Sequence, residues 1–555
     1  MKTCALALVL CLCHASAAVA QNSPAVDEFL HRIEREAKAL QNPPAPEPQL
    51  PPVVRVAPGG SIQAAVNAAT VPGTIIYLQA GGLYRESVIV PKPNVGVTLM
   101  TEGFAIGDRA VLPTDAPAMA TMQPTAGQSY AVWVMANGTR IQGVRFLAAN
   151  GNGELVRVGD NNSAVLADVP DGVTLAQNYL QGDPVAGQKR GIAANGSRLL
   201  IDQNYAENIW ANQQDSQCVA VFSTPGPVTI TRNIFGCASE NIIVGGTPPA
   251  GPEFLPSDIE VGWNVLYKPL AWQGPAGTTP PAKYQIKNLF ELKVAKRVHV
   301  HHNLMVNNWV QAQPGMSVLA TIAPNGTCGV WCVLEDVTFE NNIVWNVSGG
   351  FSVQGYYPDL PQSGQTQRVT VRNNLWYIRK AMGGSARVFQ ITNEPKDVTF
   401  DRNTIIHDGT SVVMAAEYGK KWIVGTPAAV PGGPVQGFRF TGNLTRHGAP
   451  PPSTASYGIF TKEGFGGLNL GVYFPGAVVA GNVFGGATAK QITAYNVFAG
   501  VTPTNRTQPW AAFDAEVNTN RCPTSTFIDG FGQAAGADCS TLPWALFDLL
   551  PASAK

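Results

Sequence analysis

The sequence predicts an all-β fold: a single-stranded right-handed parallel β-helix, a solenoid of stacked coils, with an asparagine ladder, an N-terminal helix cap and an irregular C-terminal cap. Three observations predict it. An alternating apolar strand followed by Asn recurs ten times along the chain, loops of varying length separate the successive copies, and only 13% of the 555 residues are charged. Each coil of a solenoid packs only against its neighbours, so the length requires no division into several cores.

The first twenty residues read as a signal peptide. Lys2 gives the positive start, residues 5–13 the apolar run, and Ala18-Val19-Ala20 the small-residue cleavage site before Gln21. The apolar run is too short to span a bilayer. We therefore expect a secreted protein that is periplasmic, extracellular or cell-surface, with no membrane span.

Four segments are expected. They are the signal peptide (1–20), an N-terminal helix and Pro-rich linker (21–52), the β-helix (53–490) and an irregular C-terminal capping segment (491–555). Ser61 precedes an amphipathic stretch and reads as the N-cap of a short helix over the first coil, which would cover an open strand edge. Strands are expected within 74–81 and 86–91.

The cysteines agree with export. Six lie beyond the signal peptide, and sequence proximity suggests the pairs Cys218–Cys237, Cys328–Cys332 and Cys522–Cys539. The alternative is a zinc site at the Cys-x3-Cys of Cys328 and Cys332. Lys+Arg (37) equals Asp+Glu (37), so no basic field indicates nucleic-acid binding.

The repeat is the strongest signal in the sequence. Pieces such as VTITRNIF (228–235), VTFENNIVW (337–345) and VTVRNNLWY (369–377) share one pattern: an apolar alternating strand, one or two polar residues, Asn, then more apolar residues. The recurring residue is Asn178, Asn204, Asn233, Asn264, Asn303, Asn342, Asn374, Asn403, Asn443 and Asn482.

A physical reason favours Asn at this position. Asn tolerates the left-handed backbone region and can bond local main chain, and stacked amides can bond one another in a ladder. A β-sandwich would instead show tight hairpin turns, and a propeller needs four strands in about 40 residues.

The body resembles the pectate-lyase-like superfamily of right-handed parallel β-helices. Within it, residues about 170–380 resemble a group of exported bacterial β-helix proteins, through GDPVAGQKRGIA (182–193), QQDSQCVAV (213–221), ASENIIVGG (238–246), SDIEVGWNVLYKPLAW (257–272) and IKNLFELKVAKRV (286–298). The resemblance implies action on a polysaccharide, since members are mostly lyases, hydrolases, esterases and epimerases, with some adhesins. The motifs typical of polygalacturonases and pectate lyases are missing, which argues against pectin as the substrate.

Polar residues repeat at the coil spacing. Asp215 lies midway in the sequence between Arg190 and Glu240, and each of the three begins an apolar strand. Neighbouring strands in a sheet lie about 4.8 Å apart, so the three side chains are expected side by side. The predicted strip comprises Lys189, Arg190, Asp215, Gln217, Glu240, Asn241, Lys287 and Glu291, flanked by Asn288 and Lys293.

The predicted strip contains groups suited to sugar chemistry. Lys189, Arg190 or Lys287 could be a base or bind a uronate carboxylate, and Asp215 and Glu240 could hold Ca²⁺. Alternatively, Asp215 would pair with Glu240 or Glu291 as the acid and base of a glycoside hydrolase. Gln217, Asn241, Asn288, Lys293 and Trp272 are expected to bind substrate. The remaining interpretation is a ladder of salt bridges that only stabilises the stack.

One further cluster has metal-ligand character. His299, His301 and His302 lie directly before the ladder Asn303, where His299 and His301 could simply face outward. We expect a polysaccharide lyase acting by β-elimination on a uronic-acid-containing glycan. A glycoside hydrolase, or a non-catalytic glycan-binding or structural β-helix, are the alternatives.

Overall fold

The computed structural model describes residues 50–555 except 149–152, 276–277, 280, 327, 358–362, 416–419, 422–429, 455–456, 462–463, 466–469, 501, 520–521 and 523–526. It also describes Glu28, His31, Arg32 and Glu34, which are helical, as expected for that segment. The expected signal peptide lies outside the described residues. The chain divides into Met1–Pro51 and Pro52–Lys555, and the fold is that of the second unit.

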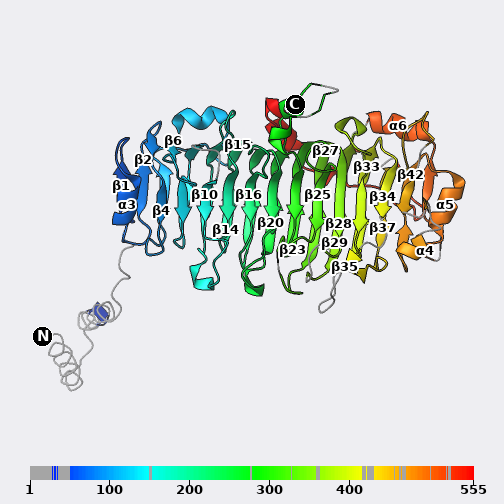
Figure 1. The fold of residues 1–555 in the computed structure, drawn as a ribbon, viewed down its shortest axis with the longest axis horizontal. Coiled ribbons are helices and arrows are strands. Elements are labelled where there is room, and N and C mark those ends of the chain that lie inside the picture. Colours follow the sequence, from blue (N-terminus) through cyan, green and yellow to red (C-terminus); the bar gives the residue numbers. More distant parts are fainter. Residues whose placement is uncertain are drawn as a thin grey trace, which may run out of the picture. The chain divides into compact units, whose positions relative to one another are not determined.

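Three long sheets make up this unit, with 14, 13 and 14 strands among the described residues (Figure 1). The first sheet contains β1 (Val53–Val56), β2 (Ile75–Leu78), β5 (Thr98–Thr101), β8 (Arg140–Gln142), β11 (Thr174–Ala176), β14 (Leu199–Asp202), β17 (Val228–Thr231), β20 (Ser257–Gly262), β23 (Ala295–His301), β26 (Leu334–Glu340), β29 (Thr366–Arg372), β32 (Lys396–Asp401), β37 (Arg439–Thr441) and β41 (Val478–Ala480).

The second sheet contains β4 (Val88–Val90), β7 (Val132–Val134), β10 (Glu154–Val158), β13 (Arg190–Ala194), β16 (Gln217–Val221), β19 (Glu240–Val244), β22 (Asn288–Leu292), β25 (Met316–Thr321), β28 (Gly349–Gln354), β31 (Phe389–Thr392), β34 (Ser411–Ala415), β39 (Gly458–Thr461) and β40 (Gly464–Phe465). The third contains β3 (Leu83–Arg85), β6 (Ala120–Gln123), β9 (Val144–Leu147), β12 (Tyr179–Gln181), β15 (Tyr205–Ile209), β18 (Ile234–Cys237), β21 (Val265–Tyr267), β24 (Leu304–Asn308), β27 (Ile343–Val347), β30 (Leu375–Ile378), β33 (Thr404–His407), β38 (Leu444–Arg446), β42 (Val483–Gly485) and β43 (Arg506–Gln508).

Helices are short and lie outside the sheets. They are α3 (Ile62–Ala68), α4 (Leu470–Tyr473), α5 (Ala489–Asn496) and α6 (Trp510–Thr519), with 3-10 turns at Pro113–Ala118, Leu166–Asp168, Pro252–Phe254, Leu270–Trp272, Ala282–Tyr284, Lys380–Met382, Cys539–Thr541, Trp544–Leu549 and Ala552–Ala554. A small antiparallel pair joins β35 (Lys420–Lys421) to β36 (Val430–Pro431). Among the described residues, no helix is long and apolar enough to cross a membrane.

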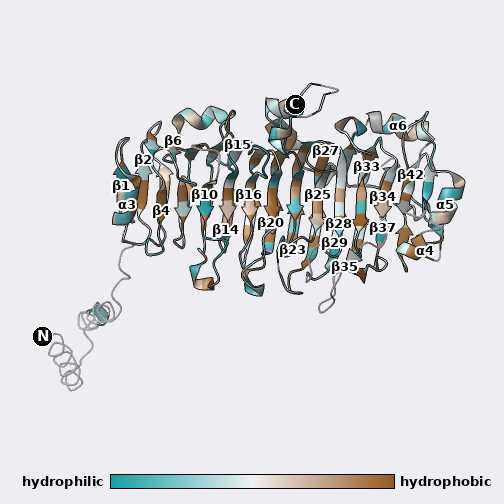
Figure 2. Cartoon of the chain, in the orientation of Figure 1, coloured by the Kyte–Doolittle hydropathy of each residue, from teal (hydrophilic) through white to brown (hydrophobic). Residues whose placement is uncertain are grey.

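The predicted parallel β-helix is confirmed. The chain visits the first, third and second sheets in turn, and each strand pairs in parallel with the strand one coil earlier; only the terminal pair β39–β40 is antiparallel among the described strands of these sheets. Figure 2 shows hydrophobic residues recurring along the strands of the stack. These residues form one continuous apolar core along the coils, as expected of stacked repeats.

The N-terminal cap is also confirmed. Ser61 is the N-cap of α3, and its hydroxyl accepts a hydrogen bond from the backbone N of Ala64 at 3.0 Å. Ile62 and Val66 are buried on the face turned to the first coil. The helix therefore covers apolar surface that the first coil would otherwise expose.

The asparagine ladder is present. Each amide Nδ2 donates to the Oδ1 of the ladder Asn in the next coil at 2.9–3.1 Å, from Asn178 to Asn482. It continues one coil further than predicted, to Asn505, at 2.9 Å. The ladder therefore extends past position 490, where the β-helix was expected to end.

The reason given for Asn needs one correction. The left-handed residue is the one before the ladder position, such as Gln203 (φ 58°), Arg232 (φ 55°) or His302 (φ 52°), not the ladder Asn itself. The selection for Asn therefore comes from its amide, which donates and accepts in the same stack. The earliest coils, from β2 to β10, precede Asn178 and were not visible in the Asn repeat.

The three expected disulfides are present. Cys218–Cys237, Cys328–Cys332 and Cys522–Cys539 have Cα–Cα distances of 5.8, 5.9 and 5.9 Å. The bonded pair Cys328–Cys332 replaces the alternative zinc site. All three bonds close short loops within the chain.

The C-terminal segment does more than cap the last coil. After α6, residues from about 527 run back along the outer face of the third sheet; we call residues 527–555 the strap. Its backbone and side chains bond Gly442, Thr404, Asn373 and finally Asn307, whose Nδ2 donates to the Ala554 carbonyl at 2.9 Å. The C-terminus accordingly lies midway along the stack (Figure 1).

Candidate active site

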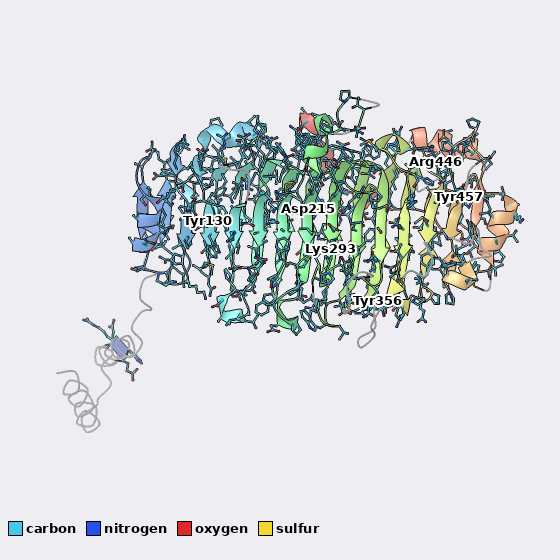
Figure 3. All side chains as sticks on the ribbon, in the orientation of Figure 1. Tyr130, Asp215, Lys293, Tyr356, Arg446 and Tyr457 are labelled. Atoms are coloured by element: carbon cyan, nitrogen blue, oxygen red, sulfur yellow. A yellow bond between two sulfur atoms is a disulfide. The ribbon has the colours of Figure 1, made fainter. Side chains whose placement is uncertain are left out.

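Five neighbouring strands of the second sheet, β10, β13, β16, β19 and β22, position the charged residues. In the observed register Glu154 pairs with Arg190, Arg190 with Gln217, and Gln217 with Glu240, with Asn288 on the next strand. Figure 3 marks Asp215 and Lys293 midway along the stack. Because strands of one sheet are about 4.8 Å apart, polar ends of neighbouring side chains can touch.

These side chains do touch, in an unbroken series that we call the contact chain: Arg157, Glu154, Arg190, Gln217, Glu240, Lys287 and Asp215. Arg157 and Arg190 each bind Glu154 at 2.7 Å. Arg190 Nε donates to Gln217 Oε1 at 2.9 Å, and Gln217 Nε2 donates to Glu240 Oε2 at 2.8 Å. The series spans five successive coils, from β10 to the residue before β22, without a gap.

Lys287 ends the contact chain between two carboxylates. Its Nζ lies 2.5 Å from Asp215 Oδ2 and 3.5 Å from Glu240 Oε1. Burial lowers the pKa of Lys287, but the charges of Glu240 and Asp215 outweigh it, and the net pKa is raised. Lys287 is therefore an ammonium at neutral pH and can donate a proton or attract an anion.

Glu240 is the most perturbed acid of the contact chain. Its side chain is 1% exposed. Burial, and then the charge of nearby Glu291, raise the pKa of Glu240 to about 8 against the opposing effect of Lys287. At pH 7 Glu240 is mostly protonated, which removes one negative charge from this face of the sheet.

A depression lies at the Arg157 end of the contact chain. It has a volume of about 270 Å³, and Glu154, Arg157, Arg190, Asn195 and Phe222 are among its lining residues. The Arg190 guanidinium lies over the Phe222 ring at 5.0 Å from its centroid. Two guanidinium groups in one depression suit a carboxylate-bearing ligand.

The structure corrects the predicted register. Gln217, not Asp215, stands between Arg190 and Glu240 on the sheet. Asp215 lies two positions earlier, outside β16, is half exposed, and reaches Lys287 instead. The equal spacing of Arg190, Asp215 and Glu240 in the sequence was misleading because the bends between coils differ in length.

Three of the residues expected to bind substrate, Asn241, Asn288 and Trp272, are buried. The Asn241 amide donates to the carbonyls of Phe235 and Tyr267, and Asn288 donates to the Met316 carbonyl, all within the buried bend. Trp272 is 6% exposed and stacks on Tyr284 at 4.9 Å. All three side chains are buried in this structure, although the Asn288 Oδ1 has no hydrogen-bond partner among the described residues.

The remaining predicted residues lie beside the contact chain. Lys293 Nζ lies 2.8 Å from Glu291 Oε1, in an ion pair that lacks hydrogen-bond geometry. Glu291 pairs in register with Ile243 on β19, so it belongs to the strand next to Glu240. Lys189 is half-buried, and its carbonyl accepts a hydrogen bond from the Gln217 backbone N at 3.0 Å.

The expected calcium ligands bind a lysine. Asp215 and Glu240 both contact the Lys287 ammonium, which supplies a positive charge between them. Among the residues that the structure describes, no group of three or more His, Cys, Asp or Glu side chains is arranged to hold a metal ion. The two carboxylates are thus paired with a cation of the chain itself.

The histidines before Asn303 form contacts with one another and with acids. His299 Nε2 lies 2.8 Å from Glu340, His301 Nε2 lies 3.3 Å from Glu260, and the Nδ1 atoms of His301 and His302 are 3.0 Å apart. They lie on the first sheet and its bend, away from the contact chain on the second sheet.

Sequence reasoning missed three residues. Glu154 and Arg157 lie one coil before Arg190, in ELVRV, a strand at the same position of the coil that could have been found by alignment with RGIAA. Lys268 is fully buried behind the contact chain, and burial lowers its pKa to about 7. A single lysine after an apolar strand gave no periodic signal.

No protein-family model and no curated protein matches the chain. Solved structures of low identity do match. The PL6 family alginate lyase AlyGC is 12% identical with a TM-score of 0.48, over 79% of this chain and 52% of AlyGC, so this chain spans about half its length. A mannuronic acid specific family 6 lyase from human gut microbiota is 12% identical (TM-score 0.38; 84% of this chain, 98% of that chain). The A-module of the Azotobacter vinelandii mannuronan C-5 epimerase AlgE4 is also 12% identical (TM-score 0.36; 76% and 88%). At these scores the likeness is one of shape and transfers no residue role.

Proposed function

We propose that this chain is an exported enzyme that cleaves a uronic-acid-containing polysaccharide by β-elimination on the outer face of the second sheet. One observation carries the proposal: the contact chain, in which basic groups and carboxyl groups, linked through Gln217, extend over five coils and end in a lysine held between two acids. A linear glycan lying along the stack would meet the groups at the two ends of the contact chain, while Gln217 and Glu240 lie buried between them.

The charge balance of this face favours an acidic substrate. Its cations are Arg157, Arg190, Lys287 and Lys293, and its carboxyl groups are Glu154, Asp215, Glu240 and Glu291. Since the pKa of Glu240 is raised to about 8, four cations face about three carboxylates at neutral pH. A uronate carboxylate in the depression beside Arg157 and Arg190 would be attracted and partly neutralised.

The elimination can be assigned to specific groups. Neutralising the carboxylate acidifies the sugar C5–H. Asp215, the half-exposed carboxylate of the contact chain, accepts the C5 proton, and the C5–H electrons form the C4–C5 double bond while the C4–O bond breaks. Lys287, beside Asp215, partly neutralises the carboxylate of the reacting uronate and donates a proton to the departing oxygen. Arg157 and Arg190, at the other end of the contact chain, hold the carboxylate of a uronate further along the glycan.

The burial of the acids argues against hydrolysis. A raised pKa suits Glu240 for a general acid, which is the observation that favours a glycoside hydrolase. However, the side chains of Glu240 and Glu291 are each 1% exposed, so neither reaches a glycosidic oxygen without rearrangement. Elimination through Asp215 and Lys287 requires no such movement.

A panel of acidic and neutral polysaccharides tests the proposal. A lyase produces unsaturated ends that absorb in the ultraviolet, whereas a hydrolase produces reducing ends without that absorbance. Asp215→Asn and Lys287→Met should each lower the rate by about 100-fold or more. Asp258→Asn is the matched control, because Asp258 is 47% exposed and binds Arg297 at 2.6 Å on the first sheet.

The outcomes separate the alternatives. Full activity in Asp215→Asn would refute the assigned site, and reducing ends without absorbance would identify a hydrolase. Binding of a glycan without cleavage across the panel would identify a binding or structural β-helix.

A further inference from the structure

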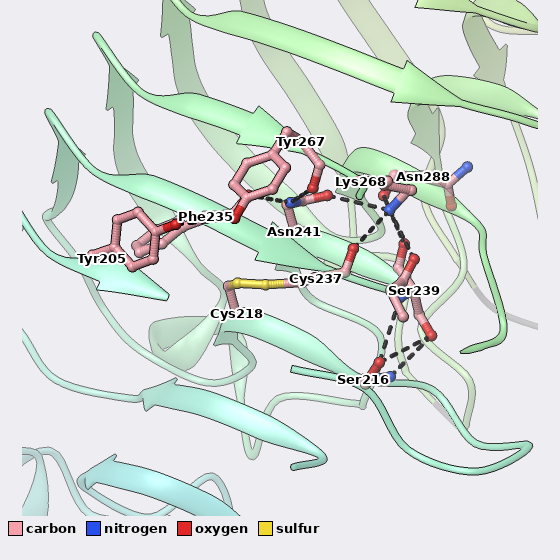
Figure 4. Close-up of a disulfide and its surroundings, with 11 residues drawn as sticks. Tyr205, Ser216, Cys218, Phe235, Cys237, Ser239, Asn241, Tyr267, Lys268 and Asn288 are labelled. Atoms are coloured by element: carbon pink, nitrogen blue, oxygen red, sulfur yellow. Dashed lines mark hydrogen bonds between the residues drawn. A yellow bond between two sulfur atoms is a disulfide. The ribbon is translucent and has the colours of Figure 1, made fainter. Parts of the chain in front are cut away.

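A lysine ammonium is enclosed by oxygen atoms directly behind the contact chain. Lys268 follows β21, and its side chain is fully buried. Its Nζ donates to the carbonyls of Cys237 (3.2 Å), Ala238 (2.8 Å) and Ser239 (3.0 Å) (Figure 4). It also lies 3.2 Å from the Asn241 Oδ1 and 3.0 Å from the Asn288 carbonyl.

The five oxygens come from two consecutive coils. Four belong to residues 237–241, where β18 ends and β19 begins, and the fifth belongs to the first residue of β22. Ser239 and Asn241 flank Glu240 in the sequence, and Asn288 follows Lys287. Lys268 thus bonds the residues next to both members of the Glu240–Lys287 contact, while touching neither side chain.

This arrangement favours the ammonium form of Lys268 against its burial, which lowers the pKa to about 7. The carbonyls of Cys237, Ala238 and Ser239 converge on a single point, where their dipoles would repel one another without a donor. The Ser239 carbonyl also accepts from the Asn288 backbone N at 3.0 Å. An ammonium offers three protons to these oxygens, whereas the lone pair of a neutral amine would face them. Oxygen atoms at 2.8–3.2 Å around one centre also resemble the carbonyl coordination that proteins give to potassium ions.

We propose that the bend 237–241 is a monovalent-cation site that the chain fills from within by the Lys268 ammonium. The site binds ammonium, potassium or a short alkylammonium ion once the lysine side chain is removed. Through its contacts with both coils, the bound cation sets the spacing of Glu240 and Lys287. Lys268 is therefore a positioning residue, and this last role rests on the proposed function.

Two variants test the cation site. Lys268→Ala leaves a cavity open to a cation, while Lys268→Met fills the same space with a neutral chain. Melting temperatures are measured in choline, sodium, potassium, ammonium and propylammonium chloride at one ionic strength. Lys296→Ala, a half-buried lysine of the first sheet, is the control.

We expect both Lys268 variants to melt about 5 °C or more below the wild type in choline. Ammonium, propylammonium and potassium should raise the melting temperature of Lys268→Ala with a saturating dose response, and leave Lys268→Met, Lys296→Ala and the wild type unchanged. The proposal is overturned if Lys268→Ala melts like the wild type, or if all salts or none restore it. If Lys268→Ala does not fold, the melting temperature of Lys268→Met decides. A Lys268→Met protein that melts at the temperature of the wild type would overturn the proposal.

Activity then tests the positioning role separately. In an active enzyme, Lys268→Ala should lose about 10- to 100-fold in kcat, more than in KM, and ammonium should recover it. Recovery of melting with an unchanged kcat would refute the positioning role alone. Recovery of melting in a chain that cleaves no glycan would leave the cation site standing and refute the proposed function.

Discussion

Replacing one rung of the asparagine ladder should destabilise the stack strongly, and Asn303→Leu is the sharpest test. The Asn303 Nδ2 donates to Asn342 Oδ1, to the Val261 carbonyl and to the His301 carbonyl, each at 2.9 Å. Its Oδ1 accepts from the backbone N of Asn264 at 2.9 Å and from the Asn264 Nδ2 at 3.0 Å. Leucine has a similar volume and makes none of these bonds.

The expected loss follows from the groups left without partners. The buried Asn264 N–H loses its acceptor, and the Val261 carbonyl loses a donor. An unsatisfied buried polar group costs about 1–3 kcal/mol, so two of them predict a loss of about 2–6 kcal/mol in the free energy of unfolding. That is a large share of the stability of a typical protein, about 5–15 kcal/mol.

Urea unfolding followed by circular dichroism measures this change. Asn162→Leu is the control, since Asn162 is exposed in a turn outside the ladder. Hydrogen exchange should locate the effect at the coils on either side of Asn303, because stacked coils interact mainly with their neighbours. A loss below about 1 kcal/mol, or equal losses in the two variants, would refute the ladder as a main source of stability.

Three further predictions concern charge and covalent bonds. Glu240 gains its charge as pH rises through about 8, so KM for an acidic glycan should rise above that pH by roughly fivefold, about 1 kcal/mol. Glu240→Gln should abolish this rise in KM, and a wild-type KM that is flat across pH 7–9 would contradict the prediction. Burial lowers the pKa of His407 to about 4 and of His447 to about 3, so both resist protonation. The stability that these two neutral imidazoles contribute is fully present above the pKa of an unfolded histidine, about 6.5. Below that pH, each lowers the free energy of unfolding by about 1.4 kcal/mol per pH unit. His447→Gln should remove that part of the slope in unfolding experiments at pH 4.5–6.5, and an unchanged slope would argue against it. The Cys218–Cys237 disulfide closes a loop with a sequence separation of 19, so replacing both by Ala should cost about 3 kcal/mol in urea unfolding, a loss that reduction of the wild type under denaturing conditions should reproduce.

The ladder shows why the fold could be predicted. One amide both donates and accepts along the stack, so every coil from Asn178 to Asn482 needs the same residue type at the same bend. Loops of different length between the bends do not disturb that requirement. The coils before Asn178 lack the amide and left no such mark on the sequence.

The site was less predictable because register depends on bends rather than on spacing. Asp215 and Gln217 differ by two positions, and only the pairing of β16 with β13 and β19 shows which one faces Arg190 and Glu240. Lys268 reaches five oxygens that belong to two coils, a convergence created by the fold. The sequence thus predicted which charged residues gather at the site, but it did not predict which of them contact one another.

The strap has a consequence for how this protein can evolve. Solenoids commonly gain or lose whole repeats, since each repeat contacts only adjacent ones. Here the strap is bonded to Gly442, Thr404, Asn373 and Asn307, which belong to four different levels of the stack. Duplicating or deleting a coil between Asn307 and Gly442 would shift these anchor points against a strap of unchanged length. The strap therefore fits only the present number of coils, and adding or removing a coil would break its hydrogen bonds to the stack.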